Sequence, residues 1–299
     1  MERVDAIIAG VNKAGTTSLY VSLAEHPDVV SSAIKETRYF LPARYGNALK
    51  PVSVWDRYFT GADRAVRLEA TPSYFYGGAA VAHAIRSTLP NPKIVVVLRE
   101  PVSRAISFFE YQKVRLRLPQ KLRIEDYIAE VDALTDHDFN DPKNERYMAI
   151  RGGRYADWLA QWWDVLGHDA VKVVYFEDLT ADGHDVLRDV SAVLGLDPDR
   201  LVGAGLRSEN RTTSFKVARL QAVALRVNDG FERVLRKTPR MKRRLRSMYF
   251  AVNGRALAAA EIPDAVAEDL RARFEEPNRR LGDLLDGAGL ARPAWLPVG

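Results

Sequence analysis

The N-terminal segment constrains the fold most strongly. Residues 4–10 read VDAIIAG, a short β-rich apolar run that ends in glycine. A polar turn rich in Gly, Thr and Ser follows at 11–18, and residues 19–24 have the character of a helix that ends near Pro27. A buried strand, a glycine-containing loop and a helix in direct succession indicate the opening unit of a parallel α/β sheet.

Apolar strands continue to alternate with helical stretches further along the chain. The clearest buried strand is KIVVVL at 93–98. Other strands are expected at 29–31, 66–69 and 171–176, and helices at 81–89, 102–114 and 155–166. Because such alternation is typical of a parallel sheet covered on both faces, the sequence predicts an α/β fold with three layers.

Two regions are expected to elaborate this core with helices. Residues 113–144 form a charged insertion of helix or loop, and 264–285 predict a terminal helix that Pro277 breaks into two pieces. We see no internal repeat, low-complexity segment or clear linker. Residues 1–299 are therefore interpreted as a single domain, with 212–299 as its helical C-terminal elaboration.

Composition narrows the class of protein. No apolar run approaches the ~20 residues that a membrane span needs, and residues 1–5 do not resemble the start of a secretory signal. The absence of cysteine excludes a disulfide framework and thiolate metal sites, and the five histidines show no metal-ligand spacing, so no metal site is predicted. A cytoplasmic location fits best. The net charge of +5 suits an anionic ligand, an anionic membrane or nucleic acid.

The turn after the first strand nearly matches a phosphate-binding pattern. Residues 10–17 read GVNKAGTT, close to G-x-x-x-x-G-K-[ST], and the expected strand and helix flank them as that pattern requires. Glycines allow a tight turn around an anion, and the N–H groups at the helix start point at phosphate oxygens. Thr16 stands where nucleoside-triphosphate enzymes carry lysine, and the lysine is Lys13 instead. The loop is thus P-loop-like; an ordinary βα turn is the alternative.

A second anion site is expected after the strand at 93–98. Arg99 follows this strand directly, and in open parallel sheets ligands bind outside the carboxyl ends of the strands. Ser107 lies about two helical turns further on. A guanidinium and a hydroxyl together suit a phosphate. The alternative is that Arg99 pairs with Glu100 or with another carboxylate at a strand end. Arg104 is expected to be a solvated helix charge.

The chain resembles the sulfotransferases that use 3′-phosphoadenosine-5′-phosphosulfate (PAPS), most closely the branch of heparan sulfate sulfotransferases and their bacterial relatives. Five segments carry the resemblance, in family order, from about residue 5 to residue 180. They are the loop Lys13-Ala14-Gly15-Thr16-Thr17-Ser18-Leu19, the segment Lys35-Glu36-Thr37-Arg38-Tyr39-Phe40, the segment Glu69-Ala70-Thr71-Pro72-Ser73-Tyr74, the run from Leu98-Arg99-Glu100-Pro101 to Ser107, and Gly153-Arg154-Tyr155 with Trp158, Trp162 and Glu177-Asp178-Leu179.

The resemblance implies which residues bind the donor and the acceptor. PAPS is the implied donor and PAP the product, with no metal. The implied donor-binding residues are Lys13, Ala14, Gly15, Thr16, Thr17, Ser18, Arg99 and Ser107, with Arg211 and Thr212 in the place of a family loop that closes over the 3′-phosphate. The implied acceptor-side residues are Arg38, Glu69, Thr71, Ser73 and Tyr74.

The resemblance also implies a mechanism. Glu36 is the implied general base for the acceptor hydroxyl, Lys13 stabilises the leaving phosphate, and Lys35 serves the acceptor or the sulfate. Two positions depart from the family: Arg38 replaces a frequent histidine, and Ala70 replaces a lysine that helps to hold anionic sugar chains. A small-molecule or glycolipid acceptor, such as a bacterial glycolipid, sugar or natural product, is therefore favoured over a heparan-like chain.

The region 216–246 is helical in character and crowded with Arg and Lys. We favour packing of its apolar face on the domain, with peripheral contact to an anionic membrane as the alternative. It lacks the patterned aromatics of a single-strand nucleic-acid platform, so no nucleic-acid partner is predicted. Two other functions stay open: a P-loop kinase, against which Thr16 argues, and a non-catalytic nucleotide-binding protein at a membrane surface. No oligomeric state is predicted.

Overall fold

The computed structural model describes residues 4–60, 65–201, 213–215, 254–256 and 262–296. Its centre is a five-stranded sheet in the order β2-β3-β1-β4-β5, and every neighbouring pair is parallel. The strands are β1 (Val4–Gly10), β2 (Val29–Ser31), β3 (Val66–Ala70), β4 (Pro92–Leu98) and β5 (Val171–Tyr175). The strands expected from the apolar runs are thus confirmed.

Strand β1 lies in the middle of the sheet. Ile8 of β1 is opposite Ala70 of β3 on one side and Val95 of β4 on the other. All seven residues of β1 are buried, because helices cover both faces at this point. The carboxyl ends of β3, β1 and β4 consequently lie next to one another at one edge of the sheet.

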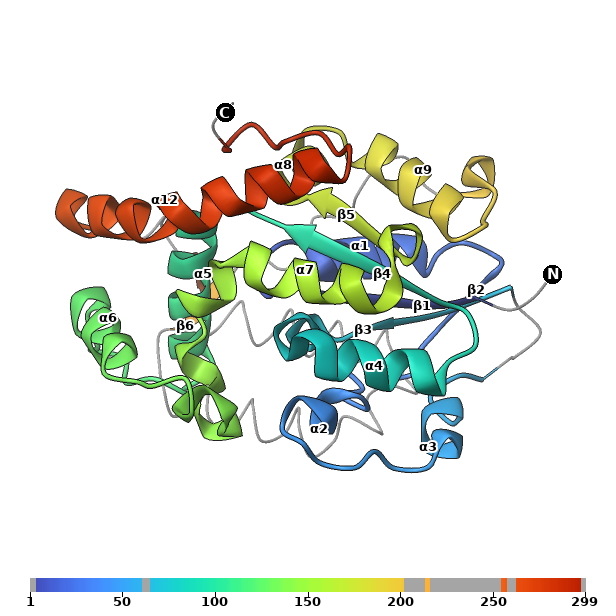
Figure 1. Ribbon diagram of the computed structural model, residues 1–299, viewed down its shortest axis with the longest axis horizontal. Helices are drawn as coiled ribbons and strands as arrows, with labels where there is room; N and C mark the ends of the chain where they lie inside the picture. Colours follow the sequence, from blue (N-terminus) through green and yellow to red (C-terminus); the bar gives the residue numbers. More distant parts are fainter. Residues whose placement is uncertain (1–3, 61–64, 202–212, 216–253, 257–261, 297–299) are drawn as a thin grey trace.

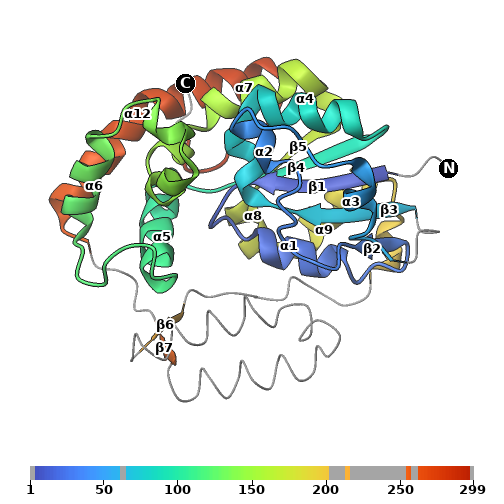
Figure 2. The ribbon, with the colours of Figure 1, turned by 90° about the horizontal axis from the view of Figure 1, so that it is seen from below.

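Helices form a layer on each face of the sheet (Figures 1 and 2). Figure 2 shows α4, α7 and α12 on one face and α1, α8 and α9 on the other, so the predicted three-layer α/β sandwich is confirmed. Their bounds are α1 (Thr16–Leu23), α4 (Gly78–Thr88), α7 (Tyr155–Leu166), α8 (Phe176–Ala181), α9 (Gly183–Val193) and α12 (Asp264–Gly287).

Shorter elements and insertions surround the three layers. Helix α5 stands beyond the carboxyl edge of the sheet, with α6 beside it (Figure 2). Small helices α2 and α3 precede β3. The bounds are α2 (Leu41–Arg44), α3 (Val52–Asp56), α5 (Pro101–Val114), α6 (Ile124–Asp132) and the 3-10 turns η1 (Pro72–Gly77), η2 (Asp138–Asn140), η3 (Pro142–Tyr147), η4 (Arg151–Gly153), η5 (His168–Ala170) and η6 (Pro198–Arg200).

The terminal helix differs from the sequence prediction. Pro277 lies inside α12, which continues from Asp264 to Gly287 as one element. Proline removes one backbone hydrogen bond, but α12 packs on α7 and α5, and it buries Phe274 before Pro277 and Leu281 after it. Tertiary packing therefore outweighs the local break.

Arg104 also differs from its predicted place. It is fully buried on α5 rather than solvated. Its guanidinium donates to the Tyr76 hydroxyl at 3.4 Å and to the Ala149 carbonyl. The reason is that α5 packs one face against the segment around η4, so this arginine points inwards and ties the helix to that segment.

Two short strands in the C-terminal part lie outside the central sheet. Strands β6 (Thr213–Phe215) and β7 (Gly254–Ala256) form an antiparallel pair, and β6 contacts α5.

The basic region 216–246 lies outside the described residues, as do Arg211 and Thr212. Among the described helices, none is both long and apolar enough to cross a bilayer.

Candidate active site

The loop between β1 and α1 lies at the carboxyl edge of the sheet. Lys13 and Gly15 both adopt left-handed backbone conformations, with φ of 71° and 78°. A Cβ at Gly15 would lie 3.0 Å from the Phe176 ring, so the position requires glycine for space as well as for conformation. The N–H groups at the start of α1 point out of the helix towards this loop, as at the start of any α-helix, and this direction favours an anion. The loop thus has the shape that the phosphate-binding prediction requires.

Arg99 links the end of β4 to this loop. Its guanidinium donates to the Lys13 carbonyl oxygen at 2.9 Å and stacks over the Phe176 ring, 4.5 Å from the centroid. The Tyr155 hydroxyl donates to the Arg99 carbonyl at 2.7 Å. Burial lowers the pKa of Arg99, with the nearby Glu177 carboxylate acting in the opposite direction. Arg99 therefore connects the two predicted anion sites through the backbone of Lys13.

Glu100, one of the two carboxylate partners considered for Arg99, does not pair with it. Its carboxylate instead caps α5, accepting from the amides of Val102 at 2.8 Å and Ser103 at 2.6 Å. The Glu100 amide donates to Glu177 at 3.0 Å, and Trp295 donates to the other oxygen of Glu177 at 3.1 Å. The guanidinium of Arg99 is thus left directed at the loop.

Lys13 carries the strongest electrostatic signal of the site. Burial, together with the positive charges of Arg99 and Lys35, lowers its pKa to about 8. Its ammonium group lies over the Tyr111 ring, 4.7 Å from the centroid. Three cations from three different segments act on one another here. A bound anion would relieve the repulsion between these cations. A group of cations of this kind is the environment that a phosphate site needs.

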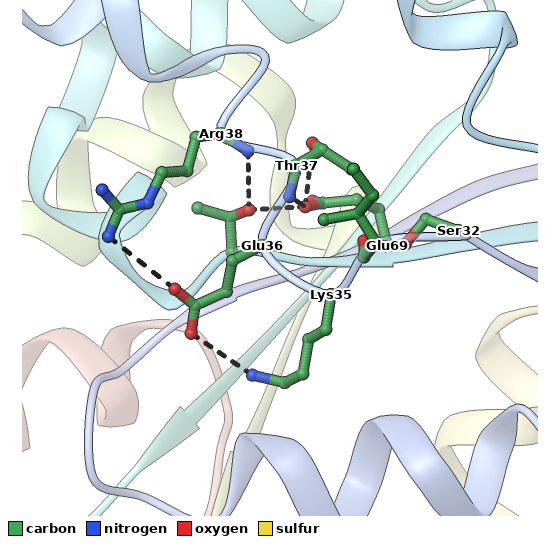
Figure 3. A network of polar contacts seen from close by, with 8 residues as sticks. Ser32, Lys35, Glu36, Thr37, Arg38 and Glu69 are labelled. Atoms are coloured by element: carbon green, nitrogen blue, oxygen red, sulfur yellow. Dashed lines mark hydrogen bonds and ion pairs between the residues drawn. The ribbon is translucent and has the colours of Figure 1, made fainter. Parts of the chain in front are cut away.

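Glu36 lies in the loop after β2. Figure 3 shows its carboxylate between Lys35, at 3.5 Å, and Arg38, at 3.8 Å. The side chain is 37% exposed, so it can reach a bound molecule. Glu36 and Arg38 have left-handed φ angles of 63° and 55°, which are unfavourable for residues with a Cβ. The loop that presents this carboxylate is therefore held in a strained conformation.

Glu69 lies beneath that loop, at the end of β3. Its side chain is fully buried, and one oxygen accepts hydrogen bonds from the Thr37 amide at 3.0 Å, the Thr37 hydroxyl at 3.1 Å and the Thr71 hydroxyl at 2.5 Å. The pKa of Glu69 is raised to about 7, mainly by burial; the hydrogen bonds from Thr71 and Thr37 act in the opposite direction, and the Glu36 charge adds to the rise. Tyr74 is buried beside Thr37, with the two hydroxyls 3.3 Å apart.

The structure brings most of the predicted site residues to one edge of the sheet. Lys13, Lys35, Glu36, Arg38 and Arg99 lie around the loop, and Ser107 is half-buried on α5. Ala14, Thr16, Thr71 and Ser73 are buried, while Thr17 and Ser18 are partly exposed at the start of α1. The contacts predicted between these residues and a donor or acceptor remain predictions.

Sequence reasoning missed three residues that touch the site. Tyr111 lies one helical turn after Ser107, a spacing that places both on one face of α5. Phe176 directly follows β5, and the rule that ligands lie beyond strand ends could have found it. Thr37, the partner of Glu69, had no signal of its own, because its role depends on the contact between two distant segments.

Comparisons with known proteins bear on this geometry. The model of the sulfotransferase-domain family matches residues 3–230. The human heparan sulfate glucosamine 3-O-sulfotransferase 6 is 31% identical over 193 residues, which cover 64% of this chain and 52% of that protein. A bifunctional heparan sulfate N-deacetylase/N-sulfotransferase 1 from Caenorhabditis elegans is 29% identical over 183 residues, covering 58% of this chain and 20% of that protein.

The fold is also shared with a solved structure. A sulfotransferase from Alicyclobacillus acidocaldarius superimposes with a TM-score of 0.58 at 24% identity, covering 70% of this chain and 87% of that one. This likeness concerns the fold alone. The family model covers the loop after β1, the Glu36 loop, the end of β4 and the Glu177 segment, which carry the motifs identified in the sequence. The chain therefore belongs to the sulfotransferase-domain family, as those motifs predicted.

Proposed function

We propose that this chain transfers a sulfuryl group from PAPS to an acceptor hydroxyl. The observation that carries the proposal is the grouping of Lys13 with Arg99 and Lys35 at the carboxyl edge of the sheet, where Lys35 also pairs with the Glu36 carboxylate. The cations match a donor with phosphate and sulfate charges, and the carboxylate matches an acceptor that must lose a proton. Family membership supports the same reaction class.

The proposed chemistry is an in-line displacement. Glu36 takes the proton of the acceptor hydroxyl, whose oxygen forms a bond to sulfur while the bond from sulfur to the 5′-phosphate oxygen breaks. Lys13 stabilises the charge on that leaving oxygen. The hydrogen bond from the Arg99 guanidinium to the Lys13 carbonyl holds the backbone of this lysine in place. Lys35 balances the Glu36 charge and approaches the transferring group. Arg99 and Ser107 bind the 3′-phosphate.

We propose a small or glycolipid hydroxyl as the acceptor. The relatives named above carry heparan sulfate in their names. In this chain Ala70 replaces the lysine implied by the resemblance, and its side chain is buried. The acceptor side thereby lacks one cation for a polyanionic sugar chain. We further propose a cytoplasmic location, with contact to a membrane surface through 216–246 if the acceptor is a lipid.

Donor binding is tested by isothermal titration of the protein with PAP and, separately, with ATP–Mg²⁺. We expect PAP to bind tightly in the presence of a metal chelator, because the site supplies its own cations. Binding of ATP–Mg²⁺ alone would instead indicate a kinase and contradict the proposal.

Transfer is tested with radiolabelled PAPS and a panel of acceptors: 2-naphthol, N-acetylglucosamine oligosaccharides and a bacterial glycolipid extract. We expect labelled product from at least one acceptor, and its loss by about 100-fold or more in Glu36→Gln and Lys13→Ala. The matched control is Glu130→Gln, at an exposed carboxylate on α6 that accepts from Tyr147. Unchanged turnover in both site variants would reject the mechanism.

A further inference from the structure

Every backbone amide from residue 36 to residue 40 has a hydrogen-bond acceptor. Four of the five acceptors lie in the segment 69–74, and the fifth is the Thr37 hydroxyl, which that segment also contacts. The donor–acceptor pairs are Glu36 to the Ala70 carbonyl (2.8 Å), Thr37 to Glu69 (3.0 Å), Arg38 to the Thr71 hydroxyl (3.3 Å), Tyr39 to the Thr37 hydroxyl (3.3 Å) and Phe40 to the Tyr74 hydroxyl (3.1 Å). The segment after β3 therefore acts as a template for the Glu36 loop.

Glu69 is the centre of this template. Its carboxylate accepts from the amide and the hydroxyl of Thr37 (Figure 3). It also accepts from the Thr71 hydroxyl. The Thr37 and Thr71 hydroxyls in turn accept from the amides of Tyr39 and Arg38, respectively. All three hydrogen bonds converge on Oε1, while Oε2 is buried and has no hydrogen-bond partner among the described residues. A buried carboxylate with an unpartnered oxygen is costly for the fold, so its presence calls for a compensating role.

Holding the strained backbone of the Glu36 loop would be such a role. The left-handed conformations of Glu36 and Arg38 flank Thr37, the residue that Glu69 grips. Unfavourable conformations persist only where the surroundings over-determine them. Hydrogen bonds to an ionised acceptor are stronger than bonds to a neutral acceptor, so a carboxylate holds such a loop better than an amide would.

We propose that Glu69 is a positioning residue for the transfer step: through Thr37 and Thr71 it fixes the strained backbone that aims the Glu36 carboxylate at the acceptor hydroxyl. The inference rests on the proposed function, because it takes Glu36 as the base. The resemblance assigns the buried residues Glu69, Thr71 and Tyr74 to the acceptor side. In this inference they do not touch the acceptor but support the loop that does. The titratable groups that face Glu69 are Glu36 and Tyr74.

The main test is Glu69→Gln, which keeps the shape of the side chain and removes its charge. We expect kcat with radiolabelled PAPS and the best acceptor of the panel to fall about 10- to 100-fold, since small misplacements of a reacting group cost this much. The KM for PAPS and the Kd for PAP should change by less than about twofold, because the donor loop is intact. The melting temperature at pH 8 should not fall, and amide exchange in the peptide covering 33–41 should accelerate.

Asp5→Asn is the matched control. Among the residues that the structure describes, Asp5 is the other buried carboxylate with an unpartnered oxygen. It pairs with Arg67 at 2.5 Å at the amino-terminal edge of the sheet, away from the site. We expect this variant to lower the melting temperature and leave kcat unchanged. A purely structural role for Glu69 predicts instead that both variants lose stability and that neither shows a selective loss of kcat.

A second pair of variants guards against misfolding of Glu69→Gln. Thr71→Val removes the hydroxyl that bridges Glu69 and the Arg38 amide, and Thr71→Ser retains it. We expect the valine variant to lower kcat selectively and the serine variant to restore it. Unchanged kcat in Glu69→Gln and Thr71→Val, with an active wild type, would overturn this inference alone. A wild type that transfers no sulfate to any acceptor overturns the proposed function, and this inference with it.

Discussion

Lys13 combines an unusual backbone with an unusual charge environment. Its left-handed conformation turns the chain at the end of β1, and its carbonyl receives the Arg99 guanidinium. Burial and two neighbouring cations lower its pKa to about 8, so a substantial part of the free protein is neutral at this position near pH 8. An arriving phosphate stabilises the ammonium form and draws a proton onto the side chain.

Proton uptake on PAP binding tests this coupling. We expect titrations near pH 8 in buffers of different ionisation enthalpy to show net proton uptake in the wild type and much less in Lys13→Met. The affinity for PAP should fall as the pH rises through about 8, because the neutral amine no longer attracts the anion.

The matched control for that experiment is Lys93→Met. Lys93 lies near the amino-terminal end of β4 and donates to the Asp169 carbonyl at 3.0 Å. It should retain the proton uptake of the wild type. Equal uptake in Lys13→Met and in the wild type would show that another group titrates.

Among the helices and strands, those that depend on a local pattern of residues could be predicted from the sequence. The apolar run at 93–98 and the strand-loop-helix at the N-terminus are readable because buried strands need continuous apolar residues. Lys13 and Arg99 could be placed at one site because parallel strands end at the same edge. The element pairing β2-β3-β1 carries no such local signal, so the contact of the Glu36 loop with Glu69 could not be predicted from either segment alone.

Local rules also failed where packing outweighs them. Arg104 reads as a surface charge on an amphipathic helix, but α5 buries the face that carries it. Pro277 reads as a helix end, but α12 continues because its apolar side is held on α7. In both elements the deciding contact comes from a segment that is distant in the sequence.

The loop between β1 and α1 yields a prediction about glycine. Gly15→Ala should lower the free energy of unfolding by about 1–2 kcal/mol, because alanine is disfavoured at φ of 78°, and the Phe176 ring must shift as well. That ring lies under Arg99, so affinity for PAP should fall too. Urea denaturation and isothermal titration measure the two effects.

Gly46→Ala is the control that separates the cost of the left-handed backbone from the effect of a contact with Phe176. Gly46 has a φ of 69°, but a Cβ there would meet nothing within 4 Å. We expect a similar conformational cost to stability and no change in PAP binding. If both variants weaken PAP binding equally, the contact of Gly15 with Phe176 does not explain the effect.

For the whole molecule, Glu69 makes stability depend on pH. Its pKa is about 7 in the folded protein against a reference value of 4.5, so the folded state binds the proton more tightly than the unfolded state does. Stability should therefore fall as the pH rises from about 4.5 to about 7, by up to about 3 kcal/mol. Glu69→Gln should lack this part of the slope.

Urea denaturation at pH 5 and pH 7.5 measures that difference. Most of the titration of Lys13 lies above pH 7.5, so this lysine contributes little to the comparison. The wild type should be more stable at pH 5, and Glu69→Gln should differ less between the two conditions. Parallel pH profiles for the two proteins would show that Glu69 does not titrate in this range.

The contact between Trp295 and Glu177 gives the site an order of assembly. Glu177 holds the Glu100 amide at the start of α5, directly after Arg99, and Trp295 fixes the other oxygen of that carboxylate. Translation produces β1, β4 and β5 well before Trp295 leaves the ribosome. The strands and the loop after β1 are therefore synthesised before Trp295 can donate to Glu177. We expect the chain to bind an anion only late in synthesis, once α12 and the segment after it have packed on the domain.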